Sequence, residues 1–424
     1  MPARRQVANK MTHISLSPNL QKDDVLTALR GLFFVWEWRK SKNIKKIKQE
    51  FCAYFKAQKI YLFNSGRSAL FVFLKSLNLK ADDEIIVQSF TCNAVVNPIL
   101  WAGAKVMYVD IDETLNINVG DLEKKINKNT RVIIAQNTFG IPAQIDKIIQ
   151  IAQKYSVLVI EDCAHSLGAT YKGQKIGTFA DAAFFSFGRD KIISSVYGGA
   201  LIVNNKTLRN NFLEEYKHVR RASILWTLQQ LVHPVITYIA LTTYTFGGKY
   251  LLYGAQKLKL LSKAVNKLEK RGKKPKYFPR RLPDPLAALA LNQFRKLDEL
   301  NRHRRELSRI YENNFKNRED VTCIENYDEG AIWLRYPIMH SDAGIIKKET
   351  KLRGIILGDW YKEVIAPAGT NMKIMNYKMG SCKTAEYVAV RILNLPTNIR
   401  TSRLEAQEIA SFIKAYSWKQ RFKK

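Results

Sequence analysis

Cysteine is scarce in this sequence, with five residues in 424. Their number is odd, and they show none of the paired spacing that metal sites require. The first 18 residues also lack the apolar core of a secretory signal. We therefore expect a reduced, cytoplasmic protein that holds no metal ion. The cysteines are Cys52, Cys92, Cys163, Cys323 and Cys382.

Acidic residues are also in short supply. The chain has 69 Lys and Arg against 37 Asp and Glu, so its formal net charge is +32. An excess of this size indicates an anionic partner, which can be nucleic acid, an acidic membrane surface or a phosphorylated substrate. The sequence contains no helix-turn-helix signature, zinc-finger spacing or RNA-binding motif, so we expect no nucleic acid.

Internal repeats and low-complexity linkers are absent, and 46% of the residues are hydrophobic, which excludes global disorder. From about residue 60 to 205, short β-rich runs alternate with segments of helical period. This alternation is typical of a mainly parallel sheet that helices cover on both faces. The sequence therefore predicts an α/β domain, whose ligands would lie beyond the carboxyl ends of the strands.

We predict four parts along the chain. Residues 1–54 form an N-terminal arm with helices, and residues 55–205 form the large α/β domain. Residues 206–281 are an insert of different composition. Residues 282–424 begin with a long connecting helix and continue as a smaller α+β domain.

The first motif is the stretch NSGRSA at residues 64–69, a predicted strand-to-helix turn around Gly66. Such a turn presents free backbone N–H groups and the positive end of the helix dipole, which suits a phosphate group. Ser65 and Ser68 would add hydroxyl donors, and Arg67 would add a charge. The alternative is an ordinary N-cap with no ligand.

The second motif is VLVIEDCAHSLGA, in which a buried strand ends at Glu161 and Asp162, with His165 three residues further on. An acid at the carboxyl end of a strand points into the ligand crevice. There it can ligate a metal, act as a base or pair with a protonated ring nitrogen. The alternative is a turn-forming Asp beside a core histidine.

The third motif is FFSFGRDKIISSVYGG at residues 184–199. Ser186 ends a strand, Lys191 follows in the loop, and the pair Gly198-Gly199 lets the next strand start close by. A lysine held in a crevice has a lowered pKa and becomes a nucleophile toward carbonyl groups. Without the other two motifs, Lys191 would be interpreted as an ordinary solvated lysine.

Together the three motifs match the needs of pyridoxal phosphate. Its phosphate group needs N–H donors, and its aldehyde needs a lysine. Its pyridine nitrogen needs a carboxylate that keeps it protonated, so that the ring can act as an electron sink.

The same motifs resemble those of the DegT/StrS family of pyridoxal-phosphate-dependent sugar aminotransferases. The resemblance is strong over residues 55–205, and it implies the aspartate-aminotransferase fold, known as PLP fold type I. The matching stretches are Ser65-Gly66-Arg67-Ser68-Ala69-Leu70, Glu161-Asp162-Cys163-Ala164-His165, Ser186 with Lys191, and Gly198-Gly199.

The resemblance implies a role for each matching residue. Lys191 would hold the cofactor covalently and then, as a free amine, move the proton during transamination. Asp162 would pair with the pyridine nitrogen, and His165 would lie beside the ring near its hydroxyl edge. Ser186 and residues 66–68, with Ser65, would bind the phosphate.

An aromatic side chain usually stacks on the cofactor ring in this family. Phe90 is the nearest candidate, whereas strict alignment puts Cys92 at that position. Which of the two lies against the ring stays open at this stage.

The chain departs from the family pattern at three places. Arg67 stands where the family has threonine, and Tyr197 stands where it has glutamate. The loop whose asparagine reaches the phosphate in the neighbouring subunit is not recognisable, and Arg280 or Arg281 is a candidate replacement. These departures concern the substrate more than the cofactor.

The function that the resemblance implies is transfer of an amino group, from glutamate, to a keto-sugar linked to a nucleotide or a lipid, in the biosynthesis of a cell-surface glycan. The family also implies a homodimer with active sites between the subunits. Relatives that act as dehydratases carry histidine in place of Lys191. The alternatives are a different pyridoxal phosphate reaction on a sugar and a non-catalytic regulator, which would be colourless after purification.

The insert combines an uncharged run with a basic one. Residues 222–248 contain no charged side chain, and residues 249–281 carry twelve basic residues and one acidic residue. The uncharged run is long enough to cross a bilayer, but its polar residues and Pro234 favour two helices or a re-entrant hairpin. With the helical spacing of 257–274, residues 222–276 resemble an anchor on an anionic membrane surface. The alternative is packing at a dimer interface.

Overall fold

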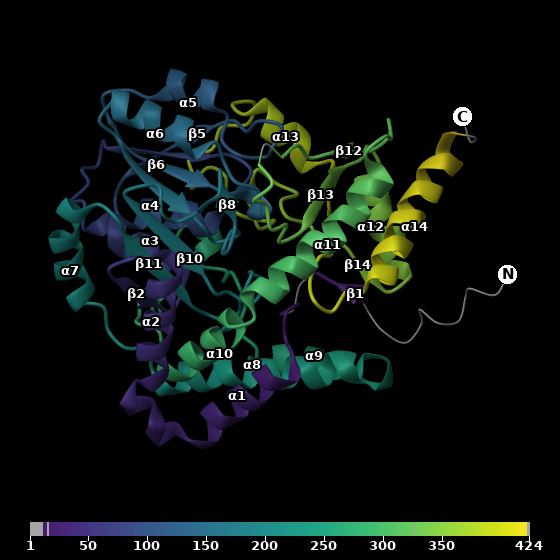
Figure 1. Ribbon diagram of the computed structural model, residues 1–424, viewed down its shortest axis with the longest axis horizontal. Coiled ribbons are helices and arrows are strands. Elements are labelled where there is room, and N and C mark those ends of the chain that lie inside the picture. Colours follow the sequence, from purple (N-terminus) through teal and green to yellow (C-terminus); the bar gives the residue numbers. More distant parts are fainter. Residues whose placement is uncertain (1–11, 15–16, 327, 422–424) are drawn as a thin grey trace.

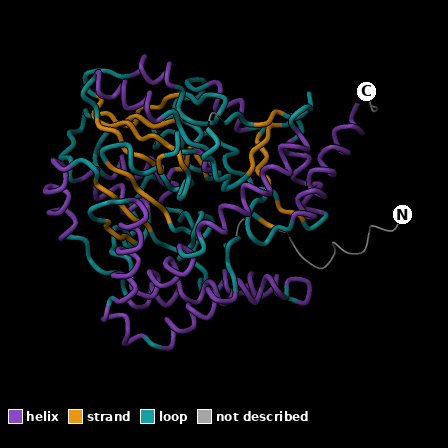
Figure 2. Tube along the Cα trace, viewed as in Figure 1, coloured by secondary structure: helices purple, strands orange, loops and turns teal. Residues whose placement is uncertain are grey.

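A seven-stranded sheet forms the centre of the larger part of the protein (Figure 1, Figure 2). The computed structural model describes residues 12–14, 17–326 and 328–421. The spatial order of the strands is β2-β11-β10-β7-β6-β3-β5, and only β11 runs antiparallel to its neighbours. The strands are β2 (Ile60–Phe63), β3 (Glu84–Gln88), β5 (Lys105–Val109), β6 (Thr130–Gln136), β7 (Leu158–Asp162), β10 (Ala182–Ser186) and β11 (Gly199–Val203).

All seven strands form at the β-rich runs of the sequence, so the predicted α/β fold class is confirmed. The runs are apolar without alternation because the strands are buried on both faces, as parallel sheets require. Two sets of helices cover the sheet, one set on each face. The first set is α2 (Lys42–Phe55), α5 (Val119–Lys125), α6 (Ile145–Lys154) and α10 (Asp284–Phe294); the second is α3 (Gly66–Lys75), α4 (Asn93–Trp101) and α7 (Arg209–Lys217).

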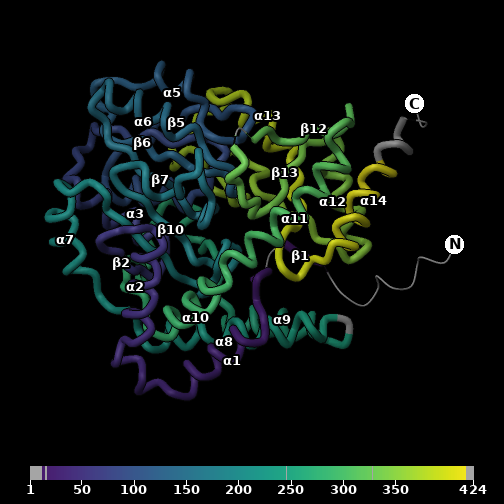
Figure 3. Tube along the Cα trace, viewed as in Figure 1, coloured from purple at the N-terminus to yellow at the C-terminus, as the bar shows by residue number. Residues whose placement is uncertain are grey.

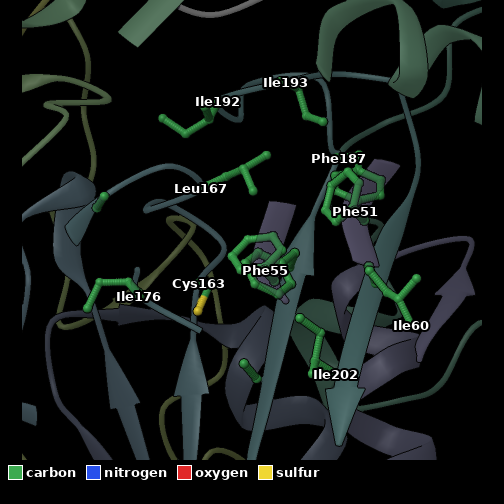
Figure 4. Packing of buried hydrophobic residues seen from close by; sticks show 14 of the residues in the cluster. Phe51, Phe55, Ile60, Cys163, Leu167, Ile176, Phe187, Ile192, Ile193 and Ile202 are labelled. Carbon is green, nitrogen blue, oxygen red and sulfur yellow. The ribbon is translucent and has the colours of Figure 1, made fainter. Parts of the chain in front are cut away.

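Aromatic side chains of α2 join the N-terminal helices to the sheet (Figure 4). The ring of Phe51 stacks on Phe294 of α10 with centroids 4.1 Å apart, and Phe55 lies 4.9 Å from Phe185 of β10. Full burial of such side chains stabilises the fold by about 2–3 kcal/mol each. The strand that leads into the third motif is therefore fixed from behind by the N-terminal helices.

A smaller α+β unit follows, as predicted. Its antiparallel sheet is β12 (Thr322–Cys323), β13 (Tyr336–Met339) and β16 (Ile392–Leu395), and it packs on α11 (Leu297–Phe315), α12 (Ala343–Leu352) and α14 (Arg403–Arg421). The N-terminal strand β1 (Thr12–His13) lies beside this unit, paired in parallel with β14 (Ile355–Ile356) (Figure 3). The connecting helix is two helices, because the chain leaves helical geometry at Lys296 between α10 and α11.

A segment of the second half of the chain returns to the large sheet. Strand β15 (Ile365–Ala366) pairs in parallel with β4 (Thr91–Cys92), and α13 (Lys383–Ala389) packs on the same face as α4. This return brings residues near 360 to the carboxyl edge of the sheet, where sequence distance alone would not place them.

The uncharged run of the insert forms a helical hairpin. Helix α8 (Ile224–Thr242) continues through Pro234, and α9 (Gly248–Lys257) packs back on it after a turn at Gly247, whose φ is +110°. The turn is therefore not at the proline. The missing N–H of Pro234 removes a single hydrogen bond, and α8 is supported by packing against α1 (Lys22–Phe33).

The basic run that follows is not the helix that its spacing predicts. Between α9 and α10 the described chain has only the 3-10 turn η6 (Glu269–Arg271), and the rest is irregular. The side chain of Glu269 turns inward here although the pattern treats it as part of a solvated face. Tertiary contacts at this residue therefore override the helical periodicity.

Candidate active site

Most of the predicted site residues meet in one cleft at the carboxyl edge of the large sheet. Strands β2, β6, β7 and β10 end there, while β11 begins there. Ser68 and Phe90 lie behind the cleft surface, in α3 and in the core respectively. The predicted residues that line the cleft are Ser65, Gly66, Arg67, Cys92, Asp162, His165, Ser186 and Lys191.

The turn of the first motif is a capped helix end. Ser65 is the N-cap of α3, and its Oγ accepts the backbone N–H of Ser68 at 3.0 Å. The Ser68 hydroxyl donates to Oδ1 of Asn64 at 2.7 Å, so its hydrogen is used within the turn. The N–H groups of Gly66 and Arg67 have no acceptor inside the helix, because they belong to its first turn. They are available to an anion in the cleft.

Glycine is required where β11 begins against this turn. A Cβ placed on Gly199 would lie 2.4 Å from the backbone nitrogen of Gly66, closer than any real contact. The Oγ of Ser186 accepts the N–H of Gly188 at 3.3 Å, which orients this hydroxyl at the end of β10. The backbone therefore forms a close-fitting cradle with a serine on each side.

The two adjacent acids of the second motif have separate tasks. Glu161 accepts backbone N–H groups of the loop 177–180 and holds that loop in place. Asp162 faces the cleft, and its Oδ1 accepts the N–H of Ala164 at 2.9 Å. Burial raises the pKa of Asp162 to about 6, although the Ala164 hydrogen bond and the charge of Lys191 act in the opposite direction. Asp162 is therefore an anion at neutral pH that lacks strong solvation.

Lys191 places its amine in the same cleft. Burial lowers its pKa to about 8, while the nearby acids Cys92 and Asp162 oppose this shift. The Nζ atom lies 4.8 Å from the centroid of the Trp360 ring. The side chain of Asn19 donates to the carbonyl oxygen of Lys191 at 2.8 Å, which fixes the loop that carries it. A large fraction of the amine is thus neutral and nucleophilic at mildly alkaline pH.

His165 is buried and neutral. Burial lowers its pKa well below the usual range, and the charges of Lys191 and Arg335 act in the same direction. Its Nδ1 accepts the backbone N–H of Phe139 at 3.3 Å, so the single ring proton is on Nε2. Nε2 lies 3.4 Å from the hydroxyl of Tyr361. The ring orientation is therefore fixed from both sides.

The two candidates for the ring-stacking position occupy different layers. Phe90 is fully buried and packs edge-on against Tyr361, with ring centroids 5.3 Å apart. Cys92 is the N-cap of α4 and lines the cleft. Burial raises the pKa of the Cys92 thiol, so it remains protonated. The assignment of Phe90 to the cofactor ring remains a prediction.

Three residues from the second half of the chain belong to the site although they were not among the predicted site residues. Trp360 and Tyr361 line the cleft opposite the sheet. The guanidinium of Arg335 lies 3.5 Å from the Trp360 ring centroid, and its Nη1 donates to Asn394 at 3.4 Å. The adjacent aromatics in the stretch GDWYK were the only local signal, and nothing in it indicates which strand ends they face.

Part of the insert closes one side of the cleft. We call residues 258–272 the strap; its Ala264 and Val265 line the cleft. Arg67 forms an ion pair with Glu269 of the strap and donates to the carbonyl oxygen of Ala264 at 2.9 Å. The second carboxylate oxygen of Glu269 accepts the N–H of Asn266 at 2.9 Å, and the Glu269 side chain is fully buried.

Both residues that depart from the family pattern near the cleft contact the strap. Besides Arg67, these contacts involve Tyr197, whose hydroxyl donates to the carbonyl oxygen of Lys263. Arg189 adds hydrogen bonds of 2.6 and 2.9 Å to Ser262. The departures are therefore connected, because the substituted side chains hold the segment that follows the helical hairpin.

The chain belongs to the DegT/DnrJ/EryC1/StrS aminotransferase family, whose sequence model matches residues 21–227 and 255–414. The unmatched residues between these ranges contain most of α8 and α9. Members of this family are pyridoxal-phosphate-dependent aminotransferases of fold type I, so the protein is an enzyme of that class.

Relatives match across most of the chain. An uncharacterized protein of Methanocaldococcus jannaschii is 30% identical over 348 residues, which are 78% of this chain and 79% of that protein. A UDP-4-amino-4,6-dideoxy-N-acetyl-beta-L-altrosamine transaminase of Campylobacter jejuni is 28% identical over 75% of this chain and 71% of its own length. The PMP form of a putative sugar aminotransferase from Streptococcus pneumoniae has a TM-score of 0.75 at 20% identity, covering 98% of this chain and 100% of the other.

Removal of the Glu269 carboxylate is expected to destabilise the protein strongly. In a Glu269→Ala variant the charge of Arg67 would lose its ion-pair partner and keep only the neutral carbonyl oxygen of Ala264, which costs about 3–5 kcal/mol of the free energy of unfolding. Urea unfolding measures this loss, with Glu325→Ala on the exposed surface as the matched control. Equal stability of the two variants would contradict the anchoring role of the Arg67–Glu269 pair.

Proposed function

We propose that this aminotransferase moves an amino group from glutamate to a keto-sugar linked to a nucleotide or a lipid, in the biosynthesis of a cell-surface glycan. The observation that supports it most is the meeting of Lys191 and Asp162 in one cleft beside the capped turn at Ser65. The similarity to a UDP-sugar transaminase supports the substrate class. The excess of basic residues suits a substrate that carries a diphosphate.

The residues of the cleft fit pyridoxal phosphate. The absence of a side chain at Gly199 lets β11 begin against the turn at Gly66, whose free N–H groups at the helix start suit a phosphate group. Ser65 and Ser186 add hydroxyl groups to the same end. Asp162, as a buried anion, would keep a ring nitrogen protonated. When bound, the cofactor supplies an electron sink.

The chain's own groups would perform the proton transfer. The Lys191 amine has a pKa of about 8, so it can hold the cofactor and later accept or give up a proton near neutral pH. His165 carries its proton on Nε2, from which it can donate a hydrogen bond beside the cofactor ring. Trp360 and Tyr361 cover the cleft from the other side and limit the access of water.

The proposal is tested by incubation of the purified protein with pyridoxal phosphate, glutamate and a panel of keto-sugar nucleotides. We expect a yellow protein whose visible band shifts on addition of glutamate, and 2-oxoglutarate as the product when the right sugar is present. A band that shifts with glutamate but yields no aminated sugar would contradict the substrate class alone. A colourless protein would contradict the catalytic proposal.

Uptake of the cofactor is expected to depend on pH through Lys191. Because burial lowers the pKa of this amine from 10.5 to about 8, the neutral fraction increases about tenfold per pH unit up to pH 8 and then levels off. Growth of the visible band after mixing cofactor-free protein with pyridoxal phosphate measures the rate. A rate that still increases tenfold between about pH 9 and pH 10 would indicate an ordinary, solvated lysine instead.

We further propose a homodimer in which Arg280 or Arg281 reaches the phosphate of the neighbouring subunit. Both residues lie beside the edge strand β2: Asn64 donates its backbone N–H to the carbonyl oxygen of Arg280 at 2.9 Å, and Arg281 bridges to Phe63. Arg281 lines a separate cavity, which favours Arg280 for this role. Sedimentation velocity measures the assembly, and recovery of activity on mixing inactive Lys191 and Arg280 variants would support sharing of the site.

The enzyme is also proposed to be cytoplasmic and to contact an anionic membrane surface through residues 222–276. Helix α8 is long and apolar enough to cross a membrane, yet 44% of its apolar stretch is buried inside the protein. Its polar Gln230 and His233 are buried, whereas Leu225 and Ile239 are exposed. The exposed side of α8 is thus the apolar one, which favours contact with a surface over crossing.

A further inference from the structure

A second cavity lies away from the active site, between α2 and the start of α8. Its volume of about 760 Å³ is within the range of small-molecule sites. The 3-10 helix η2 (Val35–Lys40), α2, the end of α7 and the segment before α10 form its walls.

Four cationic side chains surround this cavity: Arg39, Lys48, Arg221 and Arg281. Within the described ranges of the chain, none of the four forms an ion pair. Arg39 and Arg221 are exposed at the entrance, while Lys48 and Arg281 are half-buried inside. Burial lowers the pKa of Lys48, and the charges of Lys59 and Arg281 lower it further. Close like charges repel unless an anion lies between them.

The one carboxylate of the cavity wall is already used. Oδ1 of Asp284 accepts the backbone N–H groups of Asn43 and Ile44 at 2.9 and 3.0 Å, and Oδ2 accepts the Asn43 side chain at 2.8 Å. This carboxylate therefore caps the start of α2. Arg281 is held by the carbonyl oxygen of Tyr216 at 3.3 Å, and its buried Nε has no partner in the described structure.

Exposed apolar side chains lie beside the two arginines at the entrance of the cavity. Trp36 and Ile224 line the cavity and are 66% and 58% exposed, and their chain neighbours Phe34 and Leu225 are exposed as well. Large apolar side chains around a cationic pocket are typical of a surface that meets lipid chains and headgroups together. A free, fully hydrated phosphate would gain nothing from these apolar side chains.

We propose that this cavity binds the phosphate group of an anionic phospholipid at the membrane surface. The four cations would receive the phosphate, and the apolar side chains at the entrance would contact the lipid chains. The inference rests on the proposed membrane contact and gives it a defined headgroup site. Most of that site lies outside residues 222–276.

Vesicle co-sedimentation of the full-length enzyme tests the site. The probes are vesicles of phosphatidylcholine alone and with phosphatidylglycerol. A Lys48→Gln, Arg221→Gln variant removes two cavity charges, and a Lys45→Gln, Lys46→Gln variant removes two exposed charges from the same helix outside the cavity. We expect binding only with phosphatidylglycerol, weakened about tenfold or more in the cavity variant and less than about threefold in the control.

Three outcomes would overturn the site. Equal losses in the two variants would mean diffuse electrostatic attraction. Binding of glycerol phosphate or pyrophosphate in calorimetry, lost in the cavity variant and without vesicle binding, would mean a soluble phosphate ligand. A changed monomer–dimer equilibrium of the cavity variant in sedimentation would mean that a second copy covers the cavity.

Failure of the site and failure of the proposed function give different results. Vesicle binding that the cavity variant retains would overturn the headgroup site and leave the membrane contact intact. The glutamate-dependent shift of the visible band is measured in solution without vesicles. It therefore reports on the aminotransferase independently of any lipid.

Discussion

A Lys191→Ala variant is expected to lose transamination almost completely. In the proposed mechanism one side chain is both the amine that holds the cofactor and the base that moves the proton, so its loss removes both contributions at once. General acid–base catalysis alone is worth about 10²–10⁴-fold, and loss of covalent capture adds to it. We expect kcat to fall by at least about 10³-fold, measured as 2-oxoglutarate formed from glutamate. Lys172→Ala, on the exposed surface, is the matched control.

Chemical mapping separates this expectation from simple misfolding. Borohydride reduction of the loaded wild-type enzyme should fix the cofactor on the peptide that contains Lys191, and the variant should give no such peptide. Small amines added to the Lys191→Ala variant should restore part of the activity, because they replace the missing base. A reduced adduct at another lysine would refute the assignment of the catalytic residue.

The sequence was most informative where a function depends on neighbours in the chain. The carboxyl ends of parallel strands meet at one edge, so Asp162 at the end of β7 and Ser186 at the end of β10 could be placed together from their runs alone. The positions of Lys191 and Gly199 also indicated that Lys191 lies in the loop between two neighbouring strands, at the same edge of the sheet. Short, continuous apolar runs also indicated the seven strands at their correct positions.

The sequence was least informative where contacts are distant or oppose the local pattern. Trp360 and Tyr361 reach the cleft only because β15 pairs with β4, a contact that links residues more than 270 positions apart. The strap has helical spacing, yet one buried ion pair between Arg67 and Glu269 outweighs the propensity of its exposed residues. Such pairs leave no periodic signal in a single sequence.

The departures from the family pattern gain a common explanation from the strap. Arg67 and Tyr197 are separate departures in the sequence, but both contact residues 258–272. That segment enters the cleft directly after the helical hairpin that the family model does not match. The strap therefore connects the helical hairpin to the active site through hydrogen bonds and one ion pair.

An Asp162→Asn variant is expected to lose activity and gain stability at the same time. The asparagine cannot keep a ring nitrogen protonated, so we expect kcat to fall at least about 10²-fold. Burial raises the pKa of this carboxyl from 3.8 to about 6 in the folded protein. The folded state therefore binds the proton more tightly than the unfolded state, and ionisation costs stability. This cost is absent below about pH 3.8 and complete above about pH 6.

Removal of the charge should therefore stabilise the cofactor-free protein by about 3 kcal/mol at neutral pH, since each pKa unit corresponds to about 1.4 kcal/mol. Urea unfolding at about pH 7.5 and pH 5 measures the gain, which should be smaller at the lower pH because the wild-type carboxyl is then partly protonated. Asp181→Asn, at the other end of the sheet, is the control. Loss of activity without any gain in stability would mean that Asp162 is better solvated in the folded protein than its burial indicates.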